Sequence, residues 1–283
     1  MWVVLSALCA LFLSLTDLFT KKYSTDISII EIAFGRILFS VPILWLFAWI
    51  DGIPSIDIRL IHVFILSLPL ELVAIILYIK ALSISPLSLT VPFLSFTPAF
   101  LLLTSPIMVD ELPSITGIIG VMFVVFGAYA LNIKSIRMGL FYPFRMLSKE
   151  KGTLLMIFVA FIYSITSNFG KLGVIYSSPA FFAASYFSLL AIILFMITIK
   201  KGNYRNIFKK ELFLIGLFSS MMITFHMMAI KLIYVSYMIA IKRSSLLFGI
   251  IFGYLFFHEK GLKEKLIGGA IMIAGMLLIS FCR

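Results

Sequence analysis

Charges, prolines and polar clusters divide this sequence into ten apolar runs, each long enough to cross a bilayer. A transmembrane helix needs about 20 predominantly apolar residues. The runs are unbroken, whereas the strands of a membrane β-barrel alternate apolar and polar residues. The sequence therefore predicts an all-α integral membrane protein, multi-pass in the cell (cytoplasmic) membrane. The spans are expected near residues 2–20, 29–50, 59–82, 87–109, 114–132, 153–172, 179–199, 211–231, 235–257 and 263–281.

The composition limits what else the chain can contain. Only 12% of its 283 residues are charged, against about 25% in soluble domains. Ten spans leave short connectors and no room for an ordinary soluble domain of roughly 100 residues. The net charge of +11 would suggest nucleic acid in a soluble protein, but here Lys and Arg fall in connectors, where they orient helices and contact anionic lipid. We expect the lipid bilayer, and no nucleic acid, as a partner.

Two sequence blocks recur at nearly constant spacing and reveal an internal repeat. The block S-x-T-x-x-F-x-K at 14–21 returns at 164–171, a shift of 150 residues, and E-x8-G-x6-G at 111–127 returns at 259–275, a shift of 148. The repeat unit holds five spans, an odd number, so its second copy starts on the opposite side of the membrane. Inverted repeats of this kind are typical of secondary transporters. The expected units are a first repeat at 1–132, a basic interfacial connector at 133–152 and a second repeat at 153–283.

With these duplicated blocks the chain resembles the EamA-type ten-helix branch of the drug/metabolite transporter superfamily. The resemblance covers essentially the whole chain. It implies ten helices arranged as two inverted five-helix repeats around a central cavity. It also implies export or exchange of a small metabolite by alternating access. The branch is broad, so the resemblance indicates a class of activity and not a substrate.

Ionisable side chains inside spans are costly at membrane depth and are the first candidates for a functional site. Glu71 lies near the middle of the third span, too deep to reach water at the surface, so it needs an internal cation, a proton or water. For Arg36 an ion pair, a snorkelling side chain and a functional role all stay open. His226 is either a packed core histidine or part of the cavity.

Lys242 and Arg243 are adjacent cations in the ninth span. Lys242 stands seven residues before Gly249, in a stripe of small residues that allows close helix approach, so we expect this span to be internal. Two cations at a cavity wall favour an anionic substrate group, or a neutralising carboxylate such as Glu71. The pair is similar to one in plastid-type sugar-phosphate translocators, where it contacts phosphate. The lysine that those proteins carry in the fourth span is absent, since residues 93–96 read F-L-S-F.

The remaining candidates are weaker. Pro92 and Pro98 remove backbone donors from the fourth span, so they are candidates for a hinge, and Ser95 between them for a substrate contact. The tyrosines at 78 and 186 could bond substrate or simply pack. Asp17 lies close to the end of the first span, where solvation at the helix end accounts for its charge.

The leading hypothesis is a secondary, ATP-independent transporter of a small organic metabolite, with an anion favoured by Lys242 and Arg243. The alternative is proton-coupled efflux of apolar or cationic compounds through Glu71. The partners are then the small-molecule substrate and a coupling proton or counter-substrate. No phosphate-binding loop is present, and Leu262 takes the place of the second histidine of H-E-x-x-H. We therefore expect no enzyme, cofactor or metal site. The sequence does not indicate an oligomeric state.

The positive-inside rule gives a testable orientation. Of the 23 Lys and Arg residues, three lie deep inside spans: Arg36, Lys242 and Arg243. The side that holds both termini has four, in connectors or at span ends: Arg59, Lys171, Lys231 and Arg283. The other 16 lie on the opposite side. The charge bias predicts termini outside the cytoplasm, whereas the family resemblance implies cytoplasmic termini. A reporter active only outside the cytoplasm, fused after Arg283, should therefore be active. Activity of a reporter that works only in the cytoplasm would show that helix packing overrides the loop charges.

Overall fold

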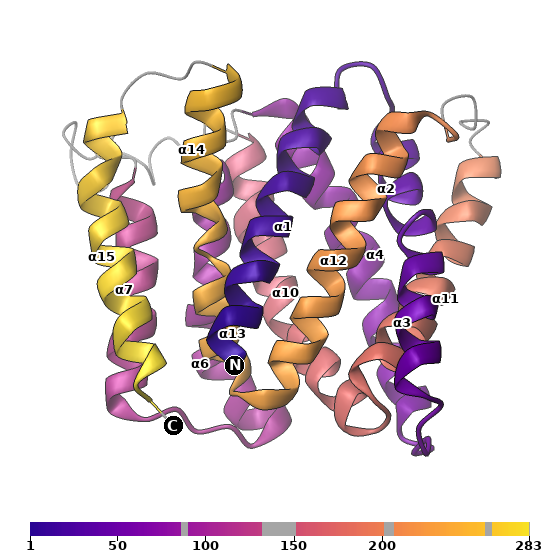
Figure 1. Ribbon diagram of the computed structural model, residues 1–283, viewed down its shortest axis with the longest axis horizontal. Coiled ribbons are helices and arrows are strands. Elements are labelled where there is room, and N and C mark those ends of the chain that lie inside the picture. The colour runs from indigo at the N-terminus through magenta and orange to yellow at the C-terminus, as the bar shows by residue number, and fades with distance from the viewer. Residues whose placement is uncertain (86–89, 132–150, 201–206, 258–261, 283) are drawn as a thin grey trace.

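The computed structural model describes residues 1–85, 90–131, 151–200, 207–257 and 262–282, and these form a helical bundle (Figure 1). The predicted connector at 133–152 lies, apart from its last two residues, outside the described residues. The elements are α1 (Trp2–Tyr23), α2 (Ile29–Leu38), α3 (Val41–Asp51), α4 (Leu60–Ile84), the 3-10 helix η1 (Val91–Ser95), α6 (Phe96–Val109), α7 (Ile115–Ala130), α10 (Lys151–Ile175), α11 (Pro179–Lys200), α12 (Lys210–Leu232), α13 (Val235–Lys242), α14 (Ser245–Phe257) and α15 (Leu262–Ser280).

These elements account for all ten predicted spans. Eight helical stretches in the described residues are long and apolar enough to cross a membrane. The fifth and tenth spans contain shorter apolar helices, Ile115–Ala130 and Lys265–Ser280. The predicted fold class, an all-α membrane protein, is confirmed.

Three spans are not continuous helices. The second divides into α2 and α3 at Phe39 and Ser40, and Pro42 stands in the first turn of α3. The fourth begins with η1, whose first turn contains Pro92. Pro98 does not break α6, because it falls in the first turn, where backbone N–H groups have no partner in the helix anyway.

The ninth span breaks at Arg243, directly after Lys242. There the backbone tightens to i−3 hydrogen bonds, such as Arg243 N to Ala240 O at 3.1 Å. A 3-10 segment inside a span is a frequent site of functional bending. The helix restarts at Ser245. Gly249 of α14 faces α1 near Ser14, and α13, which carries Lys242, packs against the same helix.

The pattern of helix contacts has the symmetry of an inverted repeat. The fifth spans pack against each other (α7 on α15), as do the second (α3 and α2 on α11) and the fourth (α6 on α13). The first span of each repeat packs against the third span of the other, α1 on α12 and α10 on α4. Exchanging the two repeats leaves this pattern unchanged, as a pseudo-two-fold axis requires.

The repeated lysines perform the same task in both repeats. Lys21 and Lys171 stand near the ends of the first helices, α1 and α10, and bond carbonyls at the end of a third helix. The last carbonyls of a helix have no partner in the helix, and a cation there also opposes the helix dipole favourably. The four acceptors lie 2.6–3.0 Å from the lysine nitrogens: Leu82 and Ser85 for Lys21, and Ile230 and Ile233 for Lys171.

The repeated glycines bring α7 and α15 into backbone contact. A Cβ atom added to Gly127 would lie 2.6 Å from the backbone nitrogen of Met272, and one added to Gly275 would lie 2.6 Å from the carbonyl oxygen of Gly120. Backbone atoms cannot move aside as a flexible side chain can. The glycines of E-x8-G-x6-G are therefore required by packing of the fifth span against the tenth.

We predict that Gly127→Ala lowers the melting temperature of the purified protein. Alanine gains up to about 1 kcal/mol in helix propensity, but the overpacking costs about 1–3 kcal/mol and forces the helices apart. Gly170→Ala is the matched control, because a Cβ there meets no atom within 4 Å. A melting temperature equal to or above that of the control would contradict the packing argument.

Candidate functional site

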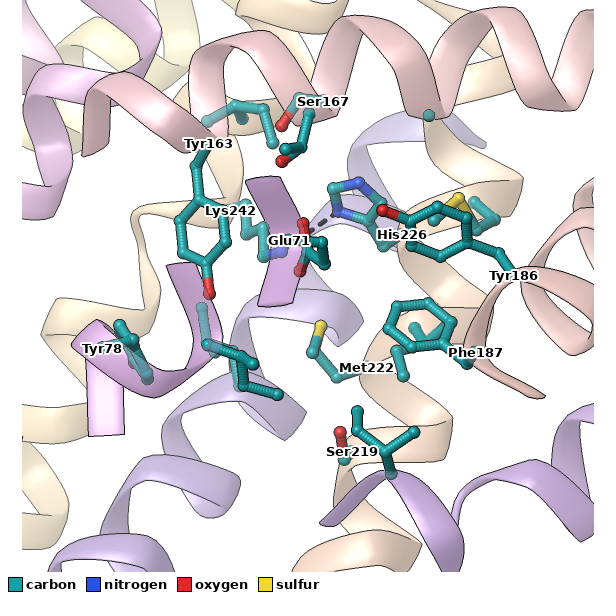
Figure 2. Close-up of a pocket in the computed structure, with 18 of the residues that line it drawn as sticks. Glu71, Tyr78, Tyr163, Ser167, Tyr186, Phe187, Ser219, Met222, His226 and Lys242 are labelled. Carbon is teal, nitrogen blue, oxygen red and sulfur yellow. Dashed lines mark hydrogen bonds between the residues drawn. The ribbon is translucent and has the colours of Figure 1, made fainter. Parts of the chain in front are cut away.

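A cavity of about 100 Å³ lies at the centre of the bundle, between helices of both repeats (Figure 2). Most of the residues expected at the site meet there, although they come from five different elements. Those that line the cavity are Arg36 from α2, Glu71 and Tyr78 from α4, Tyr186 from α11, His226 from α12, and Lys242 with Arg243 from the α13–α14 break.

Two guanidinium groups in the cavity wall have no carboxylate partner within the part of the chain that the structure describes. Arg36 donates from Nε to the hydroxyl of Ser219 at 3.0 Å, and Arg243 donates from Nη2 to Thr97 at 2.9 Å. Both residues are buried, and Arg36 Nη1 and Arg243 Nε have no hydrogen-bond partner among the described residues. Leaving a buried charged donor unpaired is costly, so the wall presents donors suited to an acceptor in the cavity.

Lys242 bonds to a histidine. Its Nζ lies 3.1 Å from Nδ1 of His226, the contact drawn as a dashed line in Figure 2. When the lysine amine is protonated it can only donate, and Nδ1 of His226 then accepts. His226 is thus both a buried residue and a cavity residue.

Glu71 shares the cavity with these cations but forms no ion pair within the described part of the chain. Thr166 of α10 lines the same cavity and adds a hydroxyl group to its wall. The expected direct neutralisation of a ninth-span cation by Glu71 is therefore not found. The reason is local, since the α13–α14 break directs Lys242 toward His226 and Arg243 toward Thr97.

The interpretation of Asp17 as a solvated residue at a helix end is wrong. α1 continues to Tyr23, so Asp17 lies more than one turn inside the helix, where it is only 3% exposed. Its carboxylate accepts a hydrogen bond of 2.5 Å from the hydroxyl of Tyr78. Asp17 does not line the cavity itself, but it fixes a tyrosine that does.

Three expected residues of the fourth span do not line the cavity: Pro92, Pro98 and Ser95. Ser95 is buried, and its hydroxyl has no partner in the described residues. The 3-10 winding of η1 presents Leu94 to the cavity instead, because three residues per turn rotate successive side chains differently from an α-helix. A hinge at Pro92 and Pro98 stays a prediction.

The cavity contains polar residues that the sequence pattern did not indicate. The internal repeat could have identified one of them, Ser219, which corresponds to Glu71. Applying the shifts of 148 and 150 residues to Arg36, Glu71, Tyr78 and Lys242 yields cavity positions in the other repeat, whereas Arg243 corresponds to Ser95, which does not line the cavity. The cavity therefore lies across the pseudo-two-fold axis, with different chemistry on its two sides. The related pairs are Arg36 and Tyr186, Glu71 and Ser219, and Tyr78 and His226, while Tyr163, Thr166 and Ser167 come from α10.

Nothing in the described residues forms a metal centre of the usual composition. No group of three or more His, Cys, Asp and Glu side chains within those ranges is placed to hold an ion. The polar groups of the cavity are cations, hydroxyls, the imidazole of His226 and one carboxylate. Such a set can bind a polar organic molecule through charge and hydrogen bonds.

The sequence pattern of the EamA-like transporter family matches residues 1–133 and 150–281. The chain belongs to the EamA-like transporter family. A protein of known crystal structure has the same fold, with a TM-score of 0.73 and 12% identity, covering 98% of this chain and 96% of the other. At this identity the likeness shows the fold alone. No curated protein matches significantly in sequence.

Membership places this EamA-like chain in the drug/metabolite transporter superfamily. Members of the family are membrane transporters. The chain is therefore a multi-pass membrane transporter of the drug/metabolite type, and the cavity between its two repeats is the candidate substrate site.

The glutamate of the repeated E-x8-G-x6-G block links the two halves of this EamA-like chain. Glu111 pairs with Lys171 at 3.2 Å and accepts a hydrogen bond of 2.6 Å from the backbone nitrogen of Val235. One carboxylate thus caps the N-terminus of α13 and holds the lysine that caps the end of α12. These contacts hold the connection between α12 and α13, and α13 ends at Lys242.

We predict that Glu111→Gln destabilises the protein, because the substitution leaves the Lys171 amine, whose side chain is only 12% exposed, without its counter-charge. Breaking a fully buried pair on one side costs about 3–5 kcal/mol, and this partly exposed pair should cost less. A double-mutant cycle with Lys171→Met, read by thermal unfolding, should show the two losses to be less than additive. Fully additive losses would mean that the two side chains do not interact.

The matched control is Asp57→Asn in the exposed pair with Arg59. The Arg59 guanidinium holds the pKa of the Asp57 carboxyl below its usual value through hydrogen bonds. Solvent screens this pair, so its loss should hardly change the melting temperature.

Proposed function

We propose that this chain is a secondary transporter of a small organic anion in the cytoplasmic membrane, working by alternating access without ATP. The supporting observation is the charge of the central cavity. Three cationic side chains, Arg36, Lys242 and Arg243, line it against the one carboxylate of Glu71.

Electrostatics favours an anion as cargo. Charges at membrane depth cost several kcal/mol unless they are compensated, and a pair of opposite charges 4 Å apart recovers about 4 kcal/mol at an effective dielectric constant of 20. Arg36 and Arg243 each keep one guanidinium nitrogen without a partner among the described residues. A carboxylate or phosphate oxygen would satisfy these donors and balance the surplus charge.

The size of the cavity limits what this conformation can enclose. Its volume is about 100 Å³. Binding sites for drug-sized ligands usually measure about 300–1,000 Å³. The cavity accommodates a charged group of the cargo, and a larger substrate requires the repeats to open.

The second candidate function is proton-coupled efflux of an apolar or cationic compound. It is favoured by Glu71, a half-buried carboxylate in the cavity wall that forms no ion pair in the described residues, and by the aromatic wall that includes Tyr163 and Tyr186. A cationic cargo would meet Glu71 but also three like charges. Repulsion by those charges makes this the weaker candidate.

Flux in proteoliposomes separates the two candidates. We expect uptake of labelled small dicarboxylates or phosphate monoesters and none of quaternary ammonium ions. Lys242→Gln and Arg243→Gln should each reduce anion flux by roughly tenfold or more, because a hydrogen bond to a charged group contributes about 1.5–3 kcal/mol. Lys80→Gln is the control, since this exposed lysine of α4 lies outside the cavity.

Glu71→Gln completes the test. If Glu71 is a counter-charge only, the variant should alter the half-saturating anion concentration and leave the pH dependence of flux unchanged. Cation flux that follows a proton gradient, survives Lys242→Gln and Arg243→Gln, and disappears in Glu71→Gln would overturn the anion proposal in favour of proton-coupled efflux.

A further inference from the structure

A second and larger cavity lies away from the centre, between α3, α11 and α12. Its volume is about 310 Å³. Its wall is mainly apolar, and two charged residues, Asp51 and Lys231, also line it. The main apolar residues are Leu44, Phe47, Ile50, Ala183 and Met228.

The position of this side cavity is that of a lipid headgroup boundary. α3 ends at Asp51, α11 begins at Pro179 and α12 ends at Leu232, all toward one end of the bundle (Figure 1). Trp49, on the same last turns of α3, is 81% exposed. Tryptophan gathers at the membrane–water interface, so the charged rim of the cavity lies at headgroup level.

The inner wall of the side cavity is buried and mainly apolar. Leu44 and Ala183 are each 1% exposed, while Ile50 and Met228 are 70% and 43% exposed. The cavity therefore has a buried floor and an apolar outer edge. An amphiphile with a polar end at the rim and a hydrocarbon segment inside matches this gradient.

The two charges of the rim do not neutralise each other. Asp51 and Lys231 are both exposed, and neither forms an ion pair within the described residues. A ligand that carries its own positive and negative groups can satisfy both at once. A purely anionic headgroup would be attracted by Lys231 and repelled by Asp51.

We propose that the side cavity binds a zwitterionic phospholipid with a primary ammonium headgroup, of the phosphatidylethanolamine type. Lys231 contacts the phosphate, Asp51 accepts hydrogen bonds from the ammonium, and part of an acyl chain occupies the apolar interior. A choline headgroup has no N–H to donate, so it binds less well. The rest of the lipid lies along the exposed edge formed by Ile50 and Met228.

The bound lipid would contact the same helices that enclose the central cavity. Ala183 of α11 and Thr224 of α12 line the side cavity, and the residues directly before them, Phe182 and Ile223, line the central one. One layer of helix separates the two sites. The proposal does not depend on the nature of the transported substrate.

The test uses the full-length purified chain with photoactivatable phosphatidylethanolamine, and with the matching phosphatidylcholine and phosphatidylglycerol probes. Labelling by the ethanolamine lipid should exceed both others and map to α3, α11 or α12. Asp51→Asn and Lys231→Gln should each reduce it about two- to fivefold, the range for one exposed ion pair. Lys80→Gln is the control, because this lysine is exposed but lines neither cavity.

Ala183→Phe should also reduce labelling by filling the interior, and its melting temperature reports whether it folds. If it does not fold, the two rim variants still decide the outcome. Equal labelling by all three lipids, or labelling unchanged in both rim variants, would show ordinary lipid contact and overturn the proposal. Preferential labelling by phosphatidylglycerol that Asp51→Asn increases would also overturn it, in favour of an anionic lipid site.

Discussion

Within a bilayer every backbone polar group must find its partner inside the protein, and the broken helices of this chain depend on that constraint. Lys21 and Lys171 supply donors to the carbonyls at the ends of α4 and α12. Ser40, at the break between α2 and α3, lies 2.7 Å from the carbonyl oxygen of Arg36 and 2.9 Å from that of Gly216. The lysines thus satisfy carbonyls where helices end, and Ser40 satisfies them where a helix is interrupted inside a span. Side chains near the interruptions, such as Arg36 and Leu94, line the central cavity.

The two repeats share a backbone plan but differ in the chemistry that they present to the cavity. The 3-10 turns of η1 and of the α13–α14 break occupy related positions, so Ser95 in one repeat corresponds to Arg243 in the other. The first turn places Leu94 at the cavity, and the second places two cations there. A symmetric scaffold thus carries an asymmetric charge, which allows one cavity to bind a polar molecule in a fixed orientation.

Helices α11 and α12 contribute residues to both the central cavity and the side cavity. Tyr186 and His226 face the centre from these helices, while Ala183 and Met228 face the side cavity. These two helices therefore separate the two cavities by a wall one helix thick. A close-packed wall transmits displacement from one face to the other.

The sequence by itself determined the span positions, the five-plus-five repeat and most of the charged residues of the site. It did so because long apolar runs, duplicated motifs and charges at membrane depth each have few physical explanations. Only the tertiary structure decided how the charges are partnered. Arg243 bonds Thr97 across 146 positions of sequence, and Tyr78 bonds Asp17 across 61. Such contacts depend on where helices break and which face then turns inward, and these follow from the packing of distant segments, not from local pattern.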